Sequence, residues 1–255
     1  MKRLFRTILS LLAVLLIGFS GCKLYGIYRE YGEGKALYSD VAGQYVRPNE
    51  LSAGAGQEAT EETAAPVTID FDALLQSNED IVAWIYCEDT NINYPVVQAG
   101  DNDYYLRRML DGSYNIAGTI FMDCRSSADF SDLKTIIYGH NMKNDTMFGS
   151  LLHYREQAYY DSHPVIWILT QENCYRLELL AGYTTSSDEE EDYGLCADPA
   201  ALSGFLTQAV EKSTFRSDVE LSSVERAVVL STCSYEYDEA RYVLIGSLIR
   251  VTLGV

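Results

Sequence analysis

The sequence predicts a mainly β domain whose strands close, or nearly close, into a barrel. Apolar runs of strand length recur along most of the chain, and only a few segments show helical spacing. Tyrosine, which suits half-buried strands, occurs 20 times among 255 residues. Apolar residues make up 47% of the chain, which is enough for one sizeable core. Many short strands with few helices are typical of barrels.

The N-terminus predicts a membrane anchor. Lys2, Arg3 and Arg6 precede an apolar stretch over residues 8–19. Basic residues stay on the cytoplasmic side, so the chain that follows is exported. We expect residues 1–28 to form an uncleaved signal anchor and the protein to cross the cell membrane once, with its globular part outside the cell.

A second interpretation of the same segment stays open. Phe19-Ser-Gly-Cys22 resembles a bacterial lipoprotein cleavage box in which Phe replaces the usual Leu. Cleavage there would leave a lipidated Cys22 at the start of the mature chain. We favour the uncleaved anchor because Phe is a poor substitute for Leu at that position.

Two further segments separate the anchor from the globular part. Apolar residues over 29–46 recur every three to four positions, which predicts a short helix above the membrane. Residues 47–66 are small, acidic and interrupted by proline, so they cannot bury enough surface to fold and are expected to form a flexible linker. The globular domain is therefore predicted to span residues 67–255.

Helices in the globular domain are expected where apolar residues recur at helical spacing behind a suitable first residue. Asp70 and Asp145 are good N-caps, and Pro199 suits a first helical turn. The expected helices are 70–76, 103–110, 145–154 and 199–210.

Strands are expected where short apolar runs lie between turn residues. Most of these runs are continuously apolar, and the run at 175–180 partly alternates with polar residues. The expected strands are 81–86, 94–98, 119–122, 135–138, 165–169, 175–180, 227–231 and 242–249.

Three strand ends carry reactive side chains. Cys233 ends the run Arg226-Ala-Val-Val-Leu-Ser-Thr-Cys233, Arg241 opens the next run, and His140 ends the run that begins at Thr135. Thiol chemistry needs a thiolate, which a nearby imidazole can generate before it protonates the leaving group. A guanidinium keeps its proton and can hold a developing negative charge. Taken singly, however, such a cysteine is more often a buried small hydrophobe.

The residues around these strand ends resemble a known family. Leu230-Ser-Thr-Cys233, with Arg241 beyond it, resembles the active-site strand pair of the sortases, the transpeptidases that attach proteins to bacterial cell walls. Ile136-Ile-Tyr-Gly-His-Asn-Met142, followed by Met147-Phe-Gly149, resembles the histidine segment of the class B branch. Further matches are Trp84-Ile85, Asn93-Tyr-Pro-Val-Val-Gln98, Asp101-Asn-Asp-Tyr-Tyr-Leu106 and Gly118-Thr-Ile-Phe-Met-Asp123.

The resemblance covers roughly residues 68–251 and implies the fold and the site. The fold would be the closed eight-stranded sortase barrel with several short helices, one of them in the connection before the cysteine strand. The implied catalytic residues are His140, Cys233 and Arg241. Two departures from the family pattern bear on substrate fit. Val229 stands where the family usually has Thr. The last strand of the family often carries a His near the position of Ile245, which this chain lacks. Candidate substrate-binding residues are Ser231, Thr232 and Tyr138.

The implied function is that of a membrane-anchored cysteine transpeptidase. It would cleave a C-terminal sorting signal of the type Asn/Ser-Pro-x-Thr-Asn/Gly in secreted proteins and transfer them to an amine of peptidoglycan or of its lipid-linked precursor. No cofactor or metal is implied. Two alternatives stay open, a Cys-His hydrolase that releases its product to water and an exported lipoprotein without activity. The formal net charge of −18 argues against nucleic acid as a partner.

The remaining cysteines, histidines and acidic residues are interpreted structurally. No cysteine pair has C-x-x-C spacing and only three histidines occur, which argues against a zinc site. His153 and His163 are expected to be structural, and the acidic run at 188–192 is expected to be a solvated loop rather than a calcium site. We expect mostly free thiols at the other cysteines of the globular domain, which are Cys87, Cys124, Cys174 and Cys196.

Overall fold

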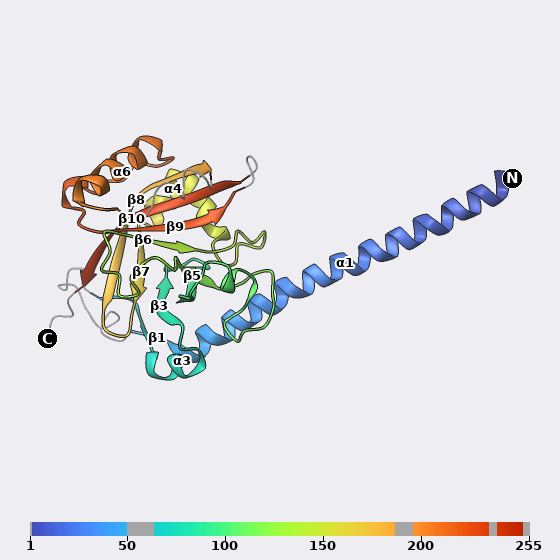
Figure 1. Ribbon diagram of the computed structural model, residues 1–255, viewed down its shortest axis with the longest axis horizontal. Helices are drawn as coiled ribbons and strands as arrows, with labels where there is room; N and C mark the ends of the chain where they lie inside the picture. The colour runs from blue at the N-terminus through green and yellow to red at the C-terminus, as the bar shows by residue number, and fades with distance from the viewer. Residues whose placement is uncertain (1, 50–63, 187–195, 235–238, 252–255) are drawn as a thin grey trace.

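The globular part of the chain is built around a closed eight-stranded barrel, which confirms the predicted fold class (Figure 1). The computed structural model describes residues 2–49, 64–186, 196–234 and 239–251. Around the barrel the strands follow the order β10-β8-β7-β3-β4-β5-β6-β9. The pairs β4–β5 and β6–β9 are parallel, and the other neighbouring pairs are antiparallel.

The barrel strands vary from short to long. Two of them, β8 and β10, are paired along nearly their whole length and run past the rest of the barrel. The barrel strands are β3 (Ile81–Tyr86), β4 (Asn93–Val97), β5 (Ile120–Met122), β6 (Lys134–Tyr138), β7 (Val165–Leu169), β8 (Cys174–Ser186), β9 (Ala227–Cys233) and β10 (Ala240–Val251).

Helices and a small second sheet surround the barrel. The sheet pairs β1 (Val46–Pro48) with β2 (Val67–Ile69). The α-helices are α1 (Lys2–Tyr45), α3 (Phe71–Ser77), α4 (Gln157–Ser162) and α6 (Pro199–Lys212), and the 3₁₀ helices are η1 (Tyr104–Arg107), η2 (Gly149–Arg155) and η3 (Leu221–Ser223). The connection between β8 and β9 contains α6, as the resemblance implied.

Apolar side chains form two clusters, a larger one that joins the barrel strands to α1 and α3, and a smaller one under α6. Trp84, Ile85 and Leu177 lie fully buried in the larger cluster. In the smaller cluster, Leu202 and Leu206 of α6 pack against residues of β6, β8, β9 and β10. Figure 1 shows α6 lying across the strands that carry the cysteine and arginine. Each fully buried aliphatic or aromatic side chain contributes on the order of 2 kcal/mol to stability.

Two predicted helices are reduced to 3₁₀ turns. In the expected helix 103–110, the carbonyls of Tyr105 and Arg107 accept hydrogen bonds from Thr119 and Asn115 instead of from the next helical turn. In the expected helix 145–154, Asp145 does not cap, because it lies in a turn at φ +60° and η2 begins only at Gly149. Both segments are held by bonds to other parts of the barrel, which the sequence pattern does not reveal.

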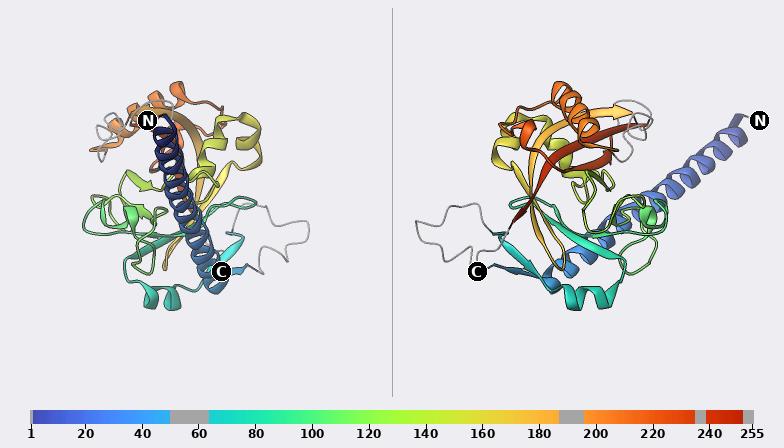
Figure 2. Two further views of the ribbon diagram at one scale, coloured as in Figure 1. Left: turned by 90° about the vertical axis from the view of Figure 1, so that its right-hand side faces the viewer. Right: turned by 60° about the vertical axis from the view of Figure 1, so that its left-hand side comes forward.

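The N-terminal region forms one continuous helix, α1, rather than an anchor with a separate helix above it. Tyr38 and Tyr45 of α1 are buried in the core, and the Tyr38 hydroxyl donates to the Gly118 carbonyl at 2.6 Å. The right-hand view of Figure 2 shows the N-terminal half of α1 extending beyond the barrel. The folded unit therefore begins within α1, well before the boundary predicted at residue 67.

The ends of the predicted linker are ordered. Arg47 and Pro48 pair with β2, and the Asn49 amide donates to the Pro66 carbonyl at 2.8 Å. The described ends of the segment therefore lie side by side. Residues 50–63 of the predicted linker and the acidic run at 188–192 lie outside the described residues.

One helix in the described part of the chain is long and apolar enough to cross a membrane, and it is α1. Its large apolar side chains from Phe5 to Tyr28 are exposed, among them Leu15 and Ile17 at 70% and 73%. Contiguous exposed apolar surface of this extent marks a segment that meets lipid or a partner. The helix is therefore a candidate membrane span.

Candidate active site

The parallel pairing of β6 and β9 brings the histidine and the cysteine to one edge of the barrel. Tyr138 of β6 is in register with Ser231 of β9, and His140 and Cys233 each follow two residues later. Parallel strands end at the same edge of a sheet. His140 and Cys233 accordingly line one groove of about 280 Å³.

Arg241 lies directly across from Cys233. The two residues are partners in the antiparallel pair β9–β10, and Arg241 Nη1 donates to Cys233 Sγ at 3.3 Å. Arg241 Nη2 lies 3.7 Å from the exposed Glu239 carboxylate. The Arg241 side chain is about three-quarters buried, with 26% of its surface exposed. The guanidinium therefore places a fixed positive charge beside the sulfur.

His140 is anchored through one ring nitrogen. Its Nε2 lies 2.7 Å from the Leu106 carbonyl oxygen, which can only accept, so Nε2 carries the proton. Nδ1 is thus the nitrogen left to exchange a proton in the groove. Burial lowers the pKa of His140 below its ordinary value, and the charges of Arg107 and Arg241 lower it further against the opposing effect of the Leu106 hydrogen bond.

Hydrogen bonds between the two strand ends fix the groove. Thr232 Oγ1 donates to the Gly139 carbonyl at 2.7 Å, and Asn141 Nδ2 donates to the Cys233 carbonyl at 2.8 Å. A Cβ at Gly139 would lie 2.5 Å from the Ile120 side chain, so glycine lets the chain pass close to β5 before His140. The histidine and cysteine segments are therefore held as one unit.

The three candidate substrate-binding residues line the same groove. The Thr232 hydroxyl is used in the bond to Gly139, whereas Ser231 Oγ is buried and has no hydrogen-bond partner among the described residues. The Tyr138 hydroxyl donates to a buried carboxylate of Asp123 at 3.1 Å. The structure thus brings together every site residue expected from the sequence, and whether these three contact substrate stays a prediction.

Sequence reasoning missed three parts of the site. The Leu106 carbonyl, which orients His140, is a backbone atom and leaves no signal of its own. Asn102 lines the groove, and its only signal is its place in the motif over residues 101–106. Asn141 donates to the Cys233 carbonyl, and its only signal is its place beside His140 in the histidine motif.

The other cysteines and histidines lie outside the groove. All six cysteines are unpaired, and Cys87 is buried beside Tyr154. His153 and His163 both pack against Tyr159, at ring-centroid distances of 5.2 and 4.4 Å. The site therefore rests on a single thiol, a single imidazole and a single guanidinium within the groove.

A closed mixed barrel with a cysteine, a histidine and an arginine at one edge defines a thiol enzyme that acts on an acyl group. Comparisons with known proteins place it more narrowly. No model of a protein family matches the chain. Over 233 residues the chain is 31% identical to sortase B of Listeria monocytogenes, covering 91% of each protein. The chain belongs to the class B sortases and is a cysteine transpeptidase of that class.

Solved structures agree with this assignment. The Staphylococcus aureus sortase B–substrate complex superposes with a TM-score of 0.72 at 28% identity, covering 88% of this chain and all of that one. A sortase B complexed with triglycine gives a TM-score of 0.66 at 31% identity, covering 71% of this chain and 86% of that one. The chain therefore shares the fold of the class B sortases.

Proposed function

We propose that the protein is a membrane-anchored sortase that cleaves a C-terminal sorting signal of the type Asn/Ser-Pro-x-Thr-Asn/Gly after the Thr. The observation that carries the proposal is the contact of Arg241 with Cys233 Sγ in the groove that also holds His140. The solved complexes of relatives with a substrate and with triglycine support a peptide donor and an amine acceptor.

The proposed reaction has two halves. The Cys233 thiolate attacks the Thr carbonyl carbon, and the Arg241 guanidinium stabilises the oxyanion. The C–N bond then breaks, the departing amine takes a proton from the His140 imidazolium, and a thioester remains. An amine of peptidoglycan or of its lipid-linked precursor attacks that thioester, loses a proton to His140 and expels the Cys233 thiolate.

The roles follow from the geometry of each group. Arg241 already donates to the sulfur, so only a small shift takes its second nitrogen to an oxygen on the attacked carbon. His140 is held at Nε2 by Leu106, which leaves Nδ1 for the proton. Its lowered pKa means that the imidazolium gives up its proton readily once the leaving amine forms.

The apolar part of α1 is proposed to anchor the enzyme, with the barrel outside the cell. Its exposed apolar side chains and the basic residues before them support this topology. Because the C-terminal part of α1 packs into the core through Tyr38 and Tyr45, the barrel would stand directly at the membrane surface. Secreted substrates and lipid-linked precursors both emerge there.

Product analysis tests the function. The full chain in detergent is incubated with Pro-x-Thr-Gly and Pro-x-Thr-Asn peptides and with candidate amines, and the products are identified by mass spectrometry. We expect an amide between the Thr carbonyl and the added amine. Release of only the free acid, with every amine tested, would instead establish a hydrolase. A Cys233→Ala chain is the matched control and should give neither product.

A further inference from the structure

Asp123 is a buried carboxylate that the catalytic steps do not use. It follows β5 directly, and only 2% of its surface is exposed. A buried charge needs a partner and hydrogen bonds, otherwise its desolvation destabilises the fold. The contacts of Asp123 therefore indicate what this carboxylate holds in place.

Arg125 keeps Asp123 ionised. Its Nε donates to Oδ1 at 2.9 Å and its Nη2 donates to Oδ2 at 2.7 Å, while its backbone N–H also donates to Oδ1 at 2.9 Å. Burial raises the pKa of Asp123, but the hydrogen bonds and charge of Arg125 outweigh it, so the pKa lies below its ordinary value. The carboxylate is thus a fixed acceptor at neutral pH.

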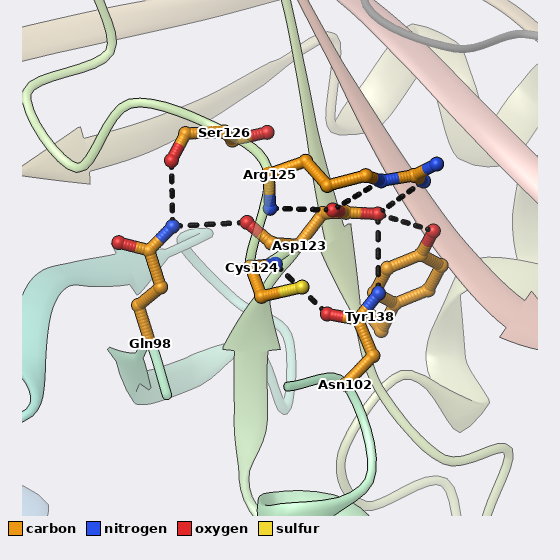
Figure 3. A network of polar contacts seen from close by, with 7 residues as sticks. All are labelled: Gln98, Asn102, Asp123, Cys124, Arg125, Ser126 and Tyr138. Atoms are coloured by element: carbon orange, nitrogen blue, oxygen red, sulfur yellow. Dashed lines mark hydrogen bonds and ion pairs between the residues drawn. The ribbon is translucent and has the colours of Figure 1, made fainter. Parts of the chain in front are cut away.

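The same carboxylate accepts from two residues of the catalytic groove (Figure 3). The Tyr138 hydroxyl donates to Oδ2 at 3.1 Å, and Asn102 Nδ2 donates to Oδ2 at 3.3 Å. Asn102 Oδ1 accepts in turn from the Cys124 amide at 2.8 Å. Both ends of the Asn102 amide are therefore held from the buried side.

These contacts join two walls of the groove. Tyr138 ends β6, two residues before His140, and Asn102 lies in the loop before η1, whose Leu106 carbonyl anchors His140. Gln98 holds the backbone of this segment, because its Nε2 donates to the backbone carbonyls of Asp123 and Ser126 at 2.9 and 2.7 Å. Asn102 keeps one N–H and one oxygen lone pair for a ligand in the groove.

We propose that Asp123, clamped by Arg125, is a positioning residue for the peptide substrate, because it fixes the Tyr138 and Asn102 side chains that form the groove wall. It touches neither the peptide nor Cys233. The inference rests on the proposed function, since it concerns how the sorting peptide is held. The Asp123 carboxylate thus affects how tightly the peptide binds and leaves the reactivity of the Cys233 thiol unchanged.

Asp123→Asn is the main test, because it keeps the shape and removes the charge. Tyr138 and Asn102 then lose a charged acceptor, and we expect KM for the peptide to rise about tenfold while kcat stays within about twofold. The alkylation rate of Cys233 by iodoacetamide should not change. An unchanged KM in a folded Asp123→Asn chain would overturn the proposal.

Arg125→Gln is the second variant, for the case that Asp123→Asn does not fold. It removes the charged partner of Asp123 from a half-exposed position and should also raise KM for the peptide. An unchanged KM in Arg125→Gln would likewise overturn the proposal.

A double-mutant cycle separates positioning from direct contact. Tyr138→Phe removes only the hydroxyl that Asp123 holds, so it should raise KM in the wild-type background and have little further effect beside Asp123→Asn. If the two effects multiply, the Tyr138 hydroxyl acts on the peptide independently and the positioning role is wrong.

Asp132→Asn is the matched control. This carboxylate accepts from the Ser127 amide at 2.5 Å and from its hydroxyl at 2.9 Å, on the same loop but outside the groove. It should change stability without changing KM. If the wild-type chain cleaves no peptide, the proposed function fails on its own. The positioning role is then decided by the crystal structure of Asp123→Asn, in which unmoved Tyr138 and Asn102 side chains would overturn it.

Discussion

Replacing Arg241 by lysine tests whether the geometry of the guanidinium, beyond its charge, drives the chemistry. In the structure one nitrogen of the guanidinium, Nη1, donates to Cys233 Sγ at 3.3 Å, while Nη2 lies 3.7 Å from the Glu239 carboxylate. In the proposed reaction one of these nitrogens stays at the sulfur and the other turns to the oxyanion. A lysine ammonium is a single point on a flexible stem. It can stay near the sulfur or reach the oxyanion, but it cannot span both positions.

The expected loss follows from the missing donor. Removing one preorganised oxyanion donor costs about a hundredfold or more in kcat, which corresponds to about 3 kcal/mol of transition-state stabilisation. Because Arg241 lies opposite Cys233 in a regular strand pair, the lysine variant should keep the register and the fold. We therefore expect kcat for peptide cleavage to fall about a hundredfold in Arg241→Lys.

Single-turnover kinetics of thioester formation measure this loss directly. Arg226→Lys is the matched control, because Arg226 precedes the same strand β9 and its Nη1 donates to the Phe130 carbonyl at 2.9 Å, away from the groove. The control should keep its rate within about twofold. Full activity in Arg241→Lys would refute the reasoning, since charge alone would then suffice.

Three further predictions concern the histidine, its support and the anchor. Arg107→Gln should raise the pKa of His140, because the charge of Arg107 disfavours the imidazolium. NMR titration measures this pKa, and 1 M salt should shrink the difference between the wild type and the variant. An unchanged pKa in the variant would contradict the assigned cause. The pKa of His140 is lower in the folded state than in the unfolded chain. Its contribution to the free energy of unfolding is therefore fully present above the ordinary histidine pKa and is lost as the pH falls through the pKa of the folded state. Gly118→Ala should lower activity and stability, because a Cβ at this φ of +57° would lie 2.6 Å from the Leu106 carbonyl that anchors His140; a normal thermal melt with a normal rate would count against it. Cys22→Ala should leave the protein membrane-bound at full length, whereas intact-mass detection of a lipidated chain lacking residues 1–21 in the wild type would replace the anchor with a lipoprotein.

Much of the fold could be predicted because the barrel strands are short apolar runs. The strands expected at 81–86 and 165–169 were found with those bounds as β3 and β7. The helix expected at 70–76 was found as α3, and Asp70 caps it by accepting from the Ala73 amide at 3.1 Å. The local sequence pattern predicts a strand or helix correctly where the element's own side chains determine which of its faces is buried.

The errors arose where distant backbone contacts override local pattern. The segment 103–110 has helical spacing, yet its carbonyls bond to residues 115, 119 and 140, so only η1 forms. Nothing in the composition of residues 47–66 shows that the Asn49 amide donates to the Pro66 carbonyl. Likewise, apolar spacing indicated a helix at 29–46 but could not show that Tyr38 enters the core.

The three expected catalytic residues meet in one groove because each lies on a barrel strand or just beyond its end. Once β6 and β9 are parallel neighbours, His140 and Cys233 share an edge, and the antiparallel β10 returns Arg241 to the same place. The resemblance supplied the strand pairing that spacing alone could not give. Asn102 and Asp123 stand out in the sequence only as parts of motifs, because their roles arise from contacts between segments.

Trapping the acyl-enzyme tests the central claim most directly. The full chain is mixed with a Pro-x-Thr-Gly or Pro-x-Thr-Asn peptide, quenched in acid and measured by intact-mass and fragment analysis. We predict one adduct with the mass of the peptide up to its Thr, located on Cys233, and none in Cys233→Ala. An adduct on another cysteine, or cleavage at near wild-type rate by Cys233→Ala, would contradict the account.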